Sequence, residues 1–488
     1  MTDTPTYVAS DVIEEAPTLR RTLGRYQVLF YGLGSMLGAG IYALIDDAAR
    51  LMGSMVWAAF LCAMVAALLT GLTYASLGSR HPKAGGAAFI TGRATRSPLI
   101  SYVVGLAVMM SGLTSMSAGT QAIAENLIKA DQMRRGTYGT VDTPEGKVDS
   151  AKASPWIKPV AIAVVAGVGL VLLKGIRESM WLNILCTIVE AGGLLFIIAV
   201  GVRFWGAQNL LEFPPVPPGK SAMPLVLMLF NGALLTFFSF IGFEDILNVS
   251  EEVKDPRVDV PFGLIGAMIA ATVIYIAVAV TAVSVIPHAT LAASSTPLMD
   301  VAKTAAPWFT GIGPVYVGVT IFAIGNTALL NYLMGSRLLY GMSTQGLLPK
   351  VLGRVSPVTR TPVVAIGALF VVVTALILAG SVAQLATATV LLLLGVFVLM
   401  NVSLLVLKRR PGEARGGFEI PAFVPALGAV VCAGLIVSEI VRPLLHEGGP
   451  KLEDFTSLLI AAGVVAVAGG LYAILRPSAD KIVEAAET

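Results

Sequence analysis

The sequence predicts an all-α membrane protein that crosses the bilayer about twelve times. Of its 488 residues, 56% are hydrophobic and only 13% are charged, and the mean hydropathy is +0.81. A soluble chain carries roughly 25% charged residues, so this chain lacks the charge to cover a water-facing surface. The charge-free runs 53–79, 97–124 and 361–407 are long enough for the ~20 apolar residues that a spanning helix needs.

The apolar runs are continuous rather than alternating, which predicts helices instead of a β-barrel. The last of these runs holds two spans, with a tight reversal near Gly380–Ser381. The twelve expected helices cover residues 26–50, 54–78, 98–126, 158–174, 179–202, 222–250, 259–286, 311–341, 361–379, 384–407, 419–441 and 457–475.

Composition also excludes several classes of function. The net charge of +3 is too small to indicate nucleic acid as a partner. The cysteines Cys62, Cys186 and Cys432 lie inside apolar runs and are too few for a disulfide framework or a zinc site. We therefore expect no metal and no bound cofactor, membrane lipid around the helices, and no evident protein partner.

The distribution of Lys and Arg predicts the orientation of the chain in the cell membrane. With the N-terminus inside, the inner segments hold 21 of these residues and the outer segments hold 12, which agrees with the excess of positive charge on the cytoplasmic side. Residues 1–22 and 476–488 are then flexible cytoplasmic tails.

The first helix is expected to break. It carries glycines at 32, 34, 38 and 40, and each costs a helix interior roughly 1 kcal/mol relative to alanine. An opened backbone within the bilayer is tolerated only where it lines a cavity. The freed amides around Gly38, Ala39 and Gly40 would then bind an anionic group such as a carboxylate. A small-residue packing face, Gly34-x-x-x-Gly38, is an equally good interpretation.

The sixth expected helix supports the interpretation that the first helix is interrupted, because it carries similar signs of an interruption. Gly242 stands between Phe240 and Phe243 and is followed at once by Glu244 and Asp245. A carboxylate at membrane depth costs about 3 kcal/mol or more and usually faces a polar cavity. The alternative is that Glu244 only caps a half-helix or pairs with Arg337, and a cap also requires a break.

Two interrupted helices, five helices apart and starting on opposite sides, indicate two inverted five-helix repeats with a site between them. We expect these repeats at 23–205 and 206–410, with helices 11 and 12 at 411–475 outside them.

Four segments carry a resemblance to a known family: 32–44, 71–89, 237–261 and 336–355. The first is glycine-rich, the third contains Glu251-Glu252-Val-Lys254, and all four occur in the family's order. The chain resembles the amino acid–polyamine–organocation permeases, and most closely their cationic and broad-specificity amino acid branch. The resemblance implies a leucine-transporter-like fold and secondary active transport of amino acids or related amines by alternating access, without enzymatic chemistry.

The resemblance also implies a binding site. The substrate carboxylate would lie on the opened segment of the first helix, and the amine on carbonyl groups near Leu33 and residues 240–242. Phe240 would act as a lid over the substrate. The residues expected to bind substrate are Ser35, Met36, Gly38, Ala39, Gly40, Ile41, Phe240, Ile241, Gly242 and Glu244.

Glu190, near the middle of the fifth helix, departs from the family. Many bacterial relatives carry a lysine there that is thought to replace a sodium ion and to couple proton movement. A buried carboxyl can carry a proton as access alternates, so we expect Glu190 to serve coupling, with a proton favoured over sodium. A sodium site, a contact to a cationic substrate, a permanently protonated structural carboxyl, and exchange without any ion remain alternatives.

Further polar residues have two interpretations each. Asp46 and Asp47 either attract cationic substrates to an outer vestibule or are simply solvated. Asn326, Thr327 and Asn331 either line the cavity or bond between helices. The segment 251–254 with Arg257 either pairs with Arg80, Lys83 and Arg93 as a cytoplasmic gate or is a solvated charge run. A channel is a weaker hypothesis, because mid-span ionisable groups are few and lie on two helices.

Overall fold

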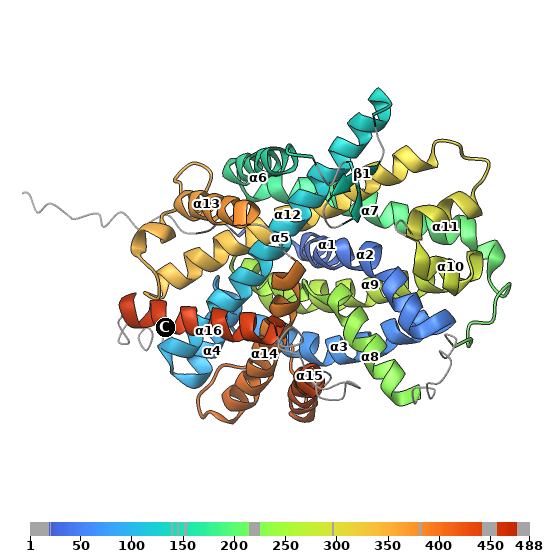
Figure 1. Cartoon of the computed structure of the whole chain (residues 1–488). Coiled ribbons are helices and arrows are strands. Elements are labelled where there is room, and N and C mark those ends of the chain that lie inside the picture. Colours follow the sequence, from blue (N-terminus) through green and yellow to red (C-terminus); the bar gives the residue numbers. More distant parts are fainter. Residues whose placement is uncertain are drawn as a thin grey trace, which may run out of the picture.

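The computed structural model describes residues 19, 21–137, 140–143, 146–150, 154–213, 225–294, 297–379, 383–441 and 456–475. These residues form sixteen α-helices and one antiparallel β-hairpin (Figure 1). The expected tails, apart from residues 19, 21 and 22, and the expected reversal at Gly380–Ser381 lie outside the described residues.

The elements follow the predicted order closely. The longer helices are α1 (Arg25–Leu37), α2 (Ala39–Met52), α3 (Val56–Arg80), α5 (Pro98–Arg135), α6 (Ile157–Lys174), α7 (Ile176–Gly201), α8 (Leu225–Phe237), α9 (Pro256–Val285), α12 (Ile312–Thr344), α13 (Val363–Ala379), α14 (Ala383–Arg409), α15 (Phe423–Val441) and α16 (Thr456–Leu475). The sequence analysis did not foresee α4 (Gly86–Thr95), α10 (His288–Ala293), α11 (Pro297–Ala305) or the pair β1 (Thr140–Thr143) and β2 (Gly146–Asp149), which are all short.

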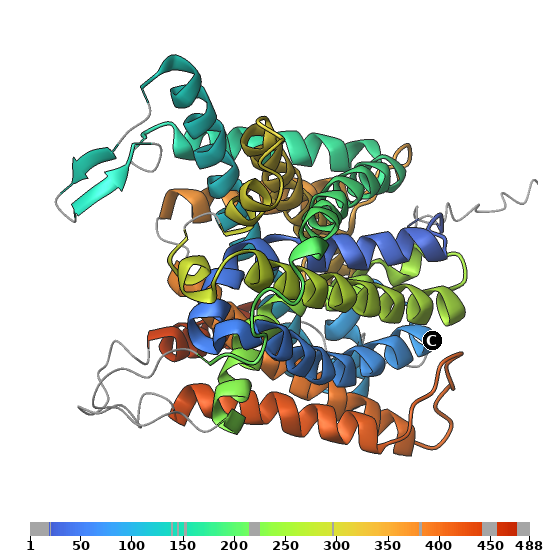
Figure 2. The same cartoon turned by 90° about the vertical axis from the view of Figure 1, so that its right-hand side faces the viewer.

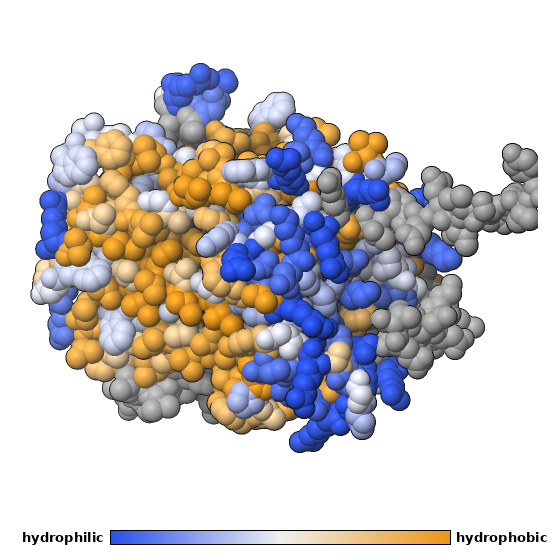
Figure 3. All heavy atoms as spheres, turned by 180° about the vertical axis from the view of Figure 1, so that it is seen from behind, coloured by the Kyte–Doolittle hydropathy of each residue, from blue (hydrophilic) through white to orange (hydrophobic). Residues whose placement is uncertain are grey.

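The helices have the apolar character of a multi-pass membrane protein. Among the described residues, seven helical stretches are long and apolar enough to cross a membrane, and α13, α15 and α16 contain shorter apolar stretches. Figure 3 shows apolar residues gathered over a broad area of one face, with hydrophilic residues gathered beside it. Large apolar side chains such as Leu170, Val273 and Val371 are exposed, which suits contact with lipid rather than water.

The first predicted helix is interrupted, as expected. Helix α1 ends at Leu37, α2 begins at Ala39, and Gly38 between them has φ −52° and ψ −142°, outside helical values. The two halves run through the middle of the bundle (Figures 1 and 2). Seven of the thirteen residues of α1 are buried, so much of this half-helix is covered by other parts of the protein.

The sixth predicted helix is interrupted as well. Helix α8 passes into a 3-10 turn, η3 (Phe238–Phe240), and the chain resumes as a second 3-10 segment, η4 (Phe243–Glu252). Gly242 between them has φ +122°, a conformation that a residue with a side chain rarely adopts. A Cβ atom there would also lie 2.7 Å from the carbonyl oxygen of Ser35, so glycine is required for the two interruptions to touch.

Candidate functional site

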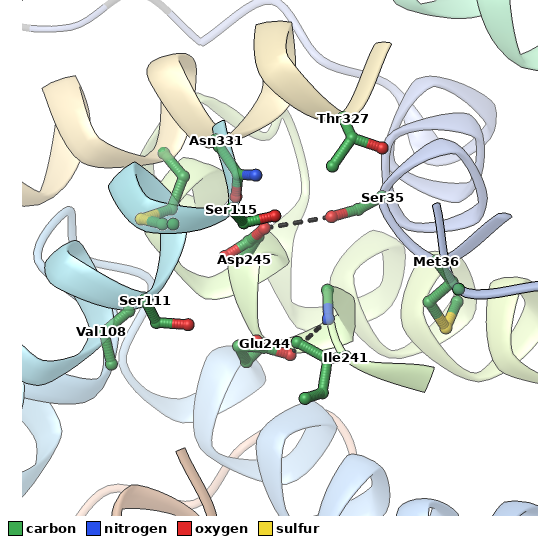
Figure 4. A pocket seen from close by; sticks show the side chains of 14 residues that line it. Ser35, Met36, Val108, Ser111, Ser115, Ile241, Glu244, Asp245, Thr327 and Asn331 are labelled. Carbon is green, nitrogen blue, oxygen red and sulfur yellow. Dashed lines mark hydrogen bonds between the residues drawn. The ribbon is translucent and has the colours of Figure 1, made fainter. Parts of the chain in front are cut away.

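A cavity lies where the two interrupted helices meet (Figure 4). Its volume is about 60 Å³, room for roughly four to six water molecules. Four elements line it: α1 with α2, the segment around η4, α5 and α12. The lining residues are Ser35, Met36, Gly40, Val108, Ser111, Gly112, Ser115, Ile241, Gly242, Glu244, Asp245, Thr327, Asn331 and Met334.

The side of the cavity formed by the first helix combines the end of one half-helix with the start of another. The last carbonyl groups of α1 and the first amides of α2 lack intrahelical partners, and they carry partial negative and positive charge respectively. One of these carbonyls has a partner, because the single proton of the buried Tyr275 hydroxyl lies within hydrogen-bonding range of the Met36 carbonyl and, at 2.9 Å, of the Ser239 carbonyl. Tyr275 thus ties the two interruptions together.

The other side of the cavity carries two neighbouring carboxyl groups with different partners. Glu244 Oε2 accepts a hydrogen bond from the backbone N–H of Gly242 at 2.8 Å, so this side chain caps the break. Asp245 Oδ2 accepts one from the hydroxyl of Ser35 at 3.0 Å. Both bonds are drawn in Figure 4, where Ser115 and Asn331 also lie beside Asp245.

The alternative pairing of Glu244 with Arg337 is wrong. Arg337 Nε lies 2.9 Å from Oε1 of Glu252, which follows Glu244 by eight residues in η4, and both side chains are fully buried. A buried guanidinium needs a carboxylate with good geometry, and Glu252 provides it. Glu244 instead accepts the hydrogen bond from the Gly242 amide and lines the cavity.

The expected site residues divide into two groups. Ser35, Met36, Gly40, Ile241, Gly242 and Glu244 line the cavity, whereas Gly38, Ile41 and Phe240 are not among its lining residues. The side chain of Ala39 lies outside the described part of the structure. In this conformation the ring of Phe240 is fully buried and packs edge-to-face on Tyr275, with centroids 5.5 Å apart. The expected lid is thus packed beside the cavity rather than facing into it.

Sequence reasoning missed the contribution of α5. Val108, Ser111, Gly112 and Ser115 line the cavity, although α5 reads as an apolar span. The signal was present as small and polar residues at 111, 112 and 115, which share one helical face. Met334 and Asp245 were also absent from the expected set. Of the three candidates on α12, Thr327 and Asn331 line the cavity, while Asn326 bonds to a neighbouring helix.

Glu190 lies outside the cavity in a separate buried polar cluster. Asn326 Nδ2 donates to Thr187 Oγ1 at 3.1 Å, and Thr187 Oγ1 donates to Asn183 Oδ1 at 3.2 Å. Asn326 is also the polar side chain that faces Glu190, yet neither carboxyl oxygen makes a hydrogen bond of ordinary geometry to the described residues.

Helix α1 approaches this cluster through Gly34. A Cβ at Gly34 would lie 2.3 Å from Thr187 Oγ1, and one at Gly38 would lie 2.0 Å from Thr327 Oγ1. The small-residue packing face and the break were posed as alternatives, but both are present on the same helix. Glycine at 34 and 38 allows α1 to lie directly against α7 and α12.

The prediction that Arg80 and Arg93 pair with the acids of the segment 251–254 is wrong. Arg80 pairs with Glu419 at 2.5 Å and Arg93 with Glu413 at 2.7 Å, both acids belonging to the segment between α14 and α15. The segment 251–254 is engaged elsewhere: Glu252 holds Arg337, and Glu251 Oε2 accepts a hydrogen bond from the backbone N–H of Ala84 at 2.7 Å. The side chains of Asp46 and Asp47 lie outside the described residues.

His81 joins this ionic network. Its Nε2 lies 3.0 Å from Glu413 Oε1. Burial, followed by the charge of Arg93, lowers the pKa of His81 from 6.5 to about 4, although Glu413 opposes the shift. Burial alone would raise the pKa of Glu413, but the hydrogen bond and charge of Arg93 hold it below its usual value.

The sequence model of the amino acid permease family matches residues 23–468, almost the whole chain. The chain belongs to this family. It is similar to the branched-chain amino acid permease BcaP of Bacillus subtilis, with 27% identity over 86% of this chain and 88% of that protein. It is also similar to the methylthioribose transporter of the same organism, with 26% identity over 87% of this chain and 89% of that protein.

Plant relatives match over a smaller share of their length. The vacuolar cationic amino acid transporter 4 of Arabidopsis thaliana is 29% identical over 81% of this permease and 64% of its own chain. The family and the relatives are transporters rather than enzymes, so this permease is a multi-pass membrane transporter of the amino acid permease family.

Proposed function

We propose that this permease is a secondary active transporter that moves amino acids across the cell membrane by alternating access. In this proposal the chain spans the bilayer twelve times as two inverted five-helix repeats, 23–205 and 206–410, with residues 411–475 as two additional helices and both termini cytoplasmic. The observation that carries it is the contact between two interrupted helices at one cavity, since opened backbone within a membrane is typical of a transporter's binding site.

The cavity offers separate places for the two charges of an amino acid. The free amides at the start of α2, around Gly40, suit a carboxylate, because a helix N-terminus carries partial positive charge. The end of α1 and the carboxyl groups of Glu244 and Asp245 suit an ammonium group. Ser35 and Met36 would contact the substrate from α1, and Phe240 would turn toward it as the cavity closes.

We propose a coupling role for Glu190, with a proton favoured over sodium. Its carboxyl is fully buried and faces Asn326, but neither of its oxygens makes a hydrogen bond of ordinary geometry to the described residues. A structural carboxyl would be expected to use its hydrogen-bonding capacity, whereas a group that takes up and releases a proton needs only a path to it. Sodium coupling, and exchange of one amino acid for another without an ion, are the competing mechanisms.

Uptake into proteoliposomes tests the proposal. The purified permease is reconstituted, and uptake of a radiolabelled amino acid mixture is measured with no gradient, with an inward proton gradient and with an inward sodium gradient. We expect saturable uptake that the proton gradient stimulates. Uptake only into vesicles preloaded with amino acid would instead indicate an exchanger, and no uptake of any amino acid under any condition would overturn the proposal.

A further inference from the structure

Helices α6 and α13 lie side by side and run in opposite directions (Figure 1). Near one end of the pair, Lys158 Nζ on α6 donates to the carbonyl of Leu378 on α13 at 3.1 Å. At the other end, a Cβ atom at Gly175 would lie 3.6 Å from the carbonyl oxygen of Thr359. The junction of α6 with α7 therefore touches the turn that precedes α13.

This turn, residues 356–361, is held by its own hydrogen bonds. The amide of Arg360 donates to the carbonyl of Ser356, and the amide of Ser356 donates to the carbonyl of Thr361, both at 2.9 Å. Arg360 has φ +54°, which a residue with a side chain adopts only where the surrounding structure enforces it. The turn therefore fixes the backbone of Arg360 close to the α6–α7 junction.

Exposed basic residues gather around this contact. Within the part of the chain that the structure describes, none of their side chains forms an ion pair. The one acid in the segments 174–181 and 350–361 is Glu178, so positive charge is in excess here. The four basic residues within five positions of Gly175 or Thr359 are Lys174, Arg177, Arg354 and Arg360.

Exposed apolar residues lie one helical turn from two of these cations, toward the middle of the helices. Trp181 follows Arg177 by four residues on α7, so the two side chains share one helix face. Leu170 precedes Lys174 by four residues on α6 in the same way. Trp181 is 63% exposed and Leu170 is 64% exposed. Because tryptophan is enriched where lipid headgroups meet hydrocarbon, the cations, about 5.4 Å further out, lie among the headgroups.

We propose that Lys174, Arg177, Arg354 and Arg360 form a surface that binds the phosphate headgroup of an anionic phospholipid, while Trp181 and Leu170 contact its acyl chains. Arginine and lysine bind phosphate oxygens through charge-assisted hydrogen bonds, and clustered basic residues at a membrane surface attract anionic lipids. A free phosphate would use the cations but not the exposed apolar residues beside them, which favours the lipid. With both termini cytoplasmic, as proposed above, this lipid lies in the cytoplasmic leaflet.

Quenching of tryptophan fluorescence by brominated lipids measures which lipid occupies this surface. The purified permease is reconstituted into phosphatidylcholine vesicles that contain the same proportion of either brominated phosphatidylglycerol or brominated phosphatidylcholine. The signal of Trp181 is obtained by subtracting that of Trp181→Phe, which keeps the remaining tryptophans of the chain. We expect phosphatidylglycerol to bind beside Trp181 at least about fivefold more tightly than phosphatidylcholine, and this preference to decrease at high salt.

Variants without the cations test the surface itself. Lys174→Gln/Arg177→Gln should bring the ratio of the two binding constants close to one. Arg134→Gln/Arg135→Gln is the matched control, because it removes the same charge from the end of α5, where both arginines pair with Asp131. It should keep the preference of the wild type. If the first double variant cannot be purified in folded form, Arg360→Gln provides the same comparison and should weaken the preference.

Three results would overturn the lipid site. The first is equal quenching of Trp181 by the two brominated lipids in the wild type. The second is an unchanged preference in folded Lys174→Gln/Arg177→Gln and in Arg360→Gln. The third is loss of the preference in excess inorganic phosphate at constant ionic strength, which would assign the cations to a free anion. Since none of these measurements involves uptake of amino acids, the proposed function stands or falls separately.

Discussion

Arg337 of α12 and Glu252 at the end of η4 form a fully buried ion pair, with Nε and Oε1 2.9 Å apart. The pair joins the segment that leaves the sixth-helix break to α12, one of the helices that line the cavity. The backbone carbonyl of Glu252 also accepts hydrogen bonds from the amides of Thr22 and Leu23, so the pair fixes the start of the first helix as well.

Removing one partner of this pair should unfold much of the site. Arg337→Met or Glu252→Gln leaves a charge buried without its counter-charge, which costs about 3–5 kcal/mol. We expect each variant to lower the thermal unfolding midpoint of the purified protein in detergent strongly. The double variant should lose less than the sum of the two, because it leaves no uncompensated charge. Strictly additive losses would show that the pair contributes little.

Close contact between the two breaks predicts a strong effect at Gly40. A Cβ atom there would lie 2.7 Å from the Cα of Ser239, a distance that backbone movement must relieve. Gly40→Ala should therefore abolish most uptake in proteoliposomes. Gly367→Ala on α13 is the control, because its Cβ would meet no atom within 4 Å and helix propensity favours the change. Comparable activity of the two variants would contradict the tight packing of the breaks.

The network around His81 predicts a dependence of stability on pH. Because burial and Arg93 lower the pKa of His81 from 6.5 to about 4, the unfolded chain binds its proton at higher pH than the folded protein does. Its contribution to stability is complete above pH 6.5 and is lost as the pH falls through about 4. Glu413, whose pKa is also lowered, adds a loss in the acidic part of this range.

Thermal unfolding midpoints between pH 7.5 and 4 should reveal this contribution. We expect a decline below about pH 6.5 in the wild type and a shallower one in His81→Gln, in which one of the two titrating groups is gone. Identical slopes for the two proteins would assign the acid sensitivity to other groups.

The sequence predicted the long apolar helices because bilayer helices need long apolar runs, which are visible in the sequence itself. It predicted the interruptions at Gly38 and Gly242 because glycine clusters and buried acids are incompatible with continuous apolar helix. The short helices and the hairpin β1–β2 were missed, because elements of four to ten residues are too short for a hydrophobic period to stand out in the sequence.

Pairings between distant segments were less predictable. Glu413 pairs with Arg93, and Glu419 pairs with Arg80. Nothing in the sequence spacing of these two acids distinguishes them as partners from Glu251 and Glu252. Similarly, α5 contributes Ser111 and Ser115 to the cavity. The sequence did not predict this, because the rotation of an apolar helix about its axis is set by the helices that pack against it. The charge and length of a helix can be read from its own segment of sequence. The lining of a cavity depends on how four separate segments are placed relative to one another, which the sequence does not give.

Glu190 allows the coupling proposal to be tested apart from substrate binding, because it lies outside the cavity lining. Glu190→Gln removes the titratable group while keeping its size. We expect the stimulation of uptake by an inward proton gradient to disappear, because no carboxyl remains to carry the proton, while exchange of labelled for unlabelled amino acid across the membrane continues. Both are measured in the same proteoliposome preparation.

Glu178→Gln provides the matched control, since Glu178 lies on the same helix α7 but is exposed at its first turn. It should behave as the wild type in both assays. Proton stimulation that survives in Glu190→Gln would exclude this carboxyl as the proton carrier. A loss of exchange together with stimulation would instead assign Glu190 to the structure of the cluster with Asn326, because a group needed only for coupling leaves exchange intact.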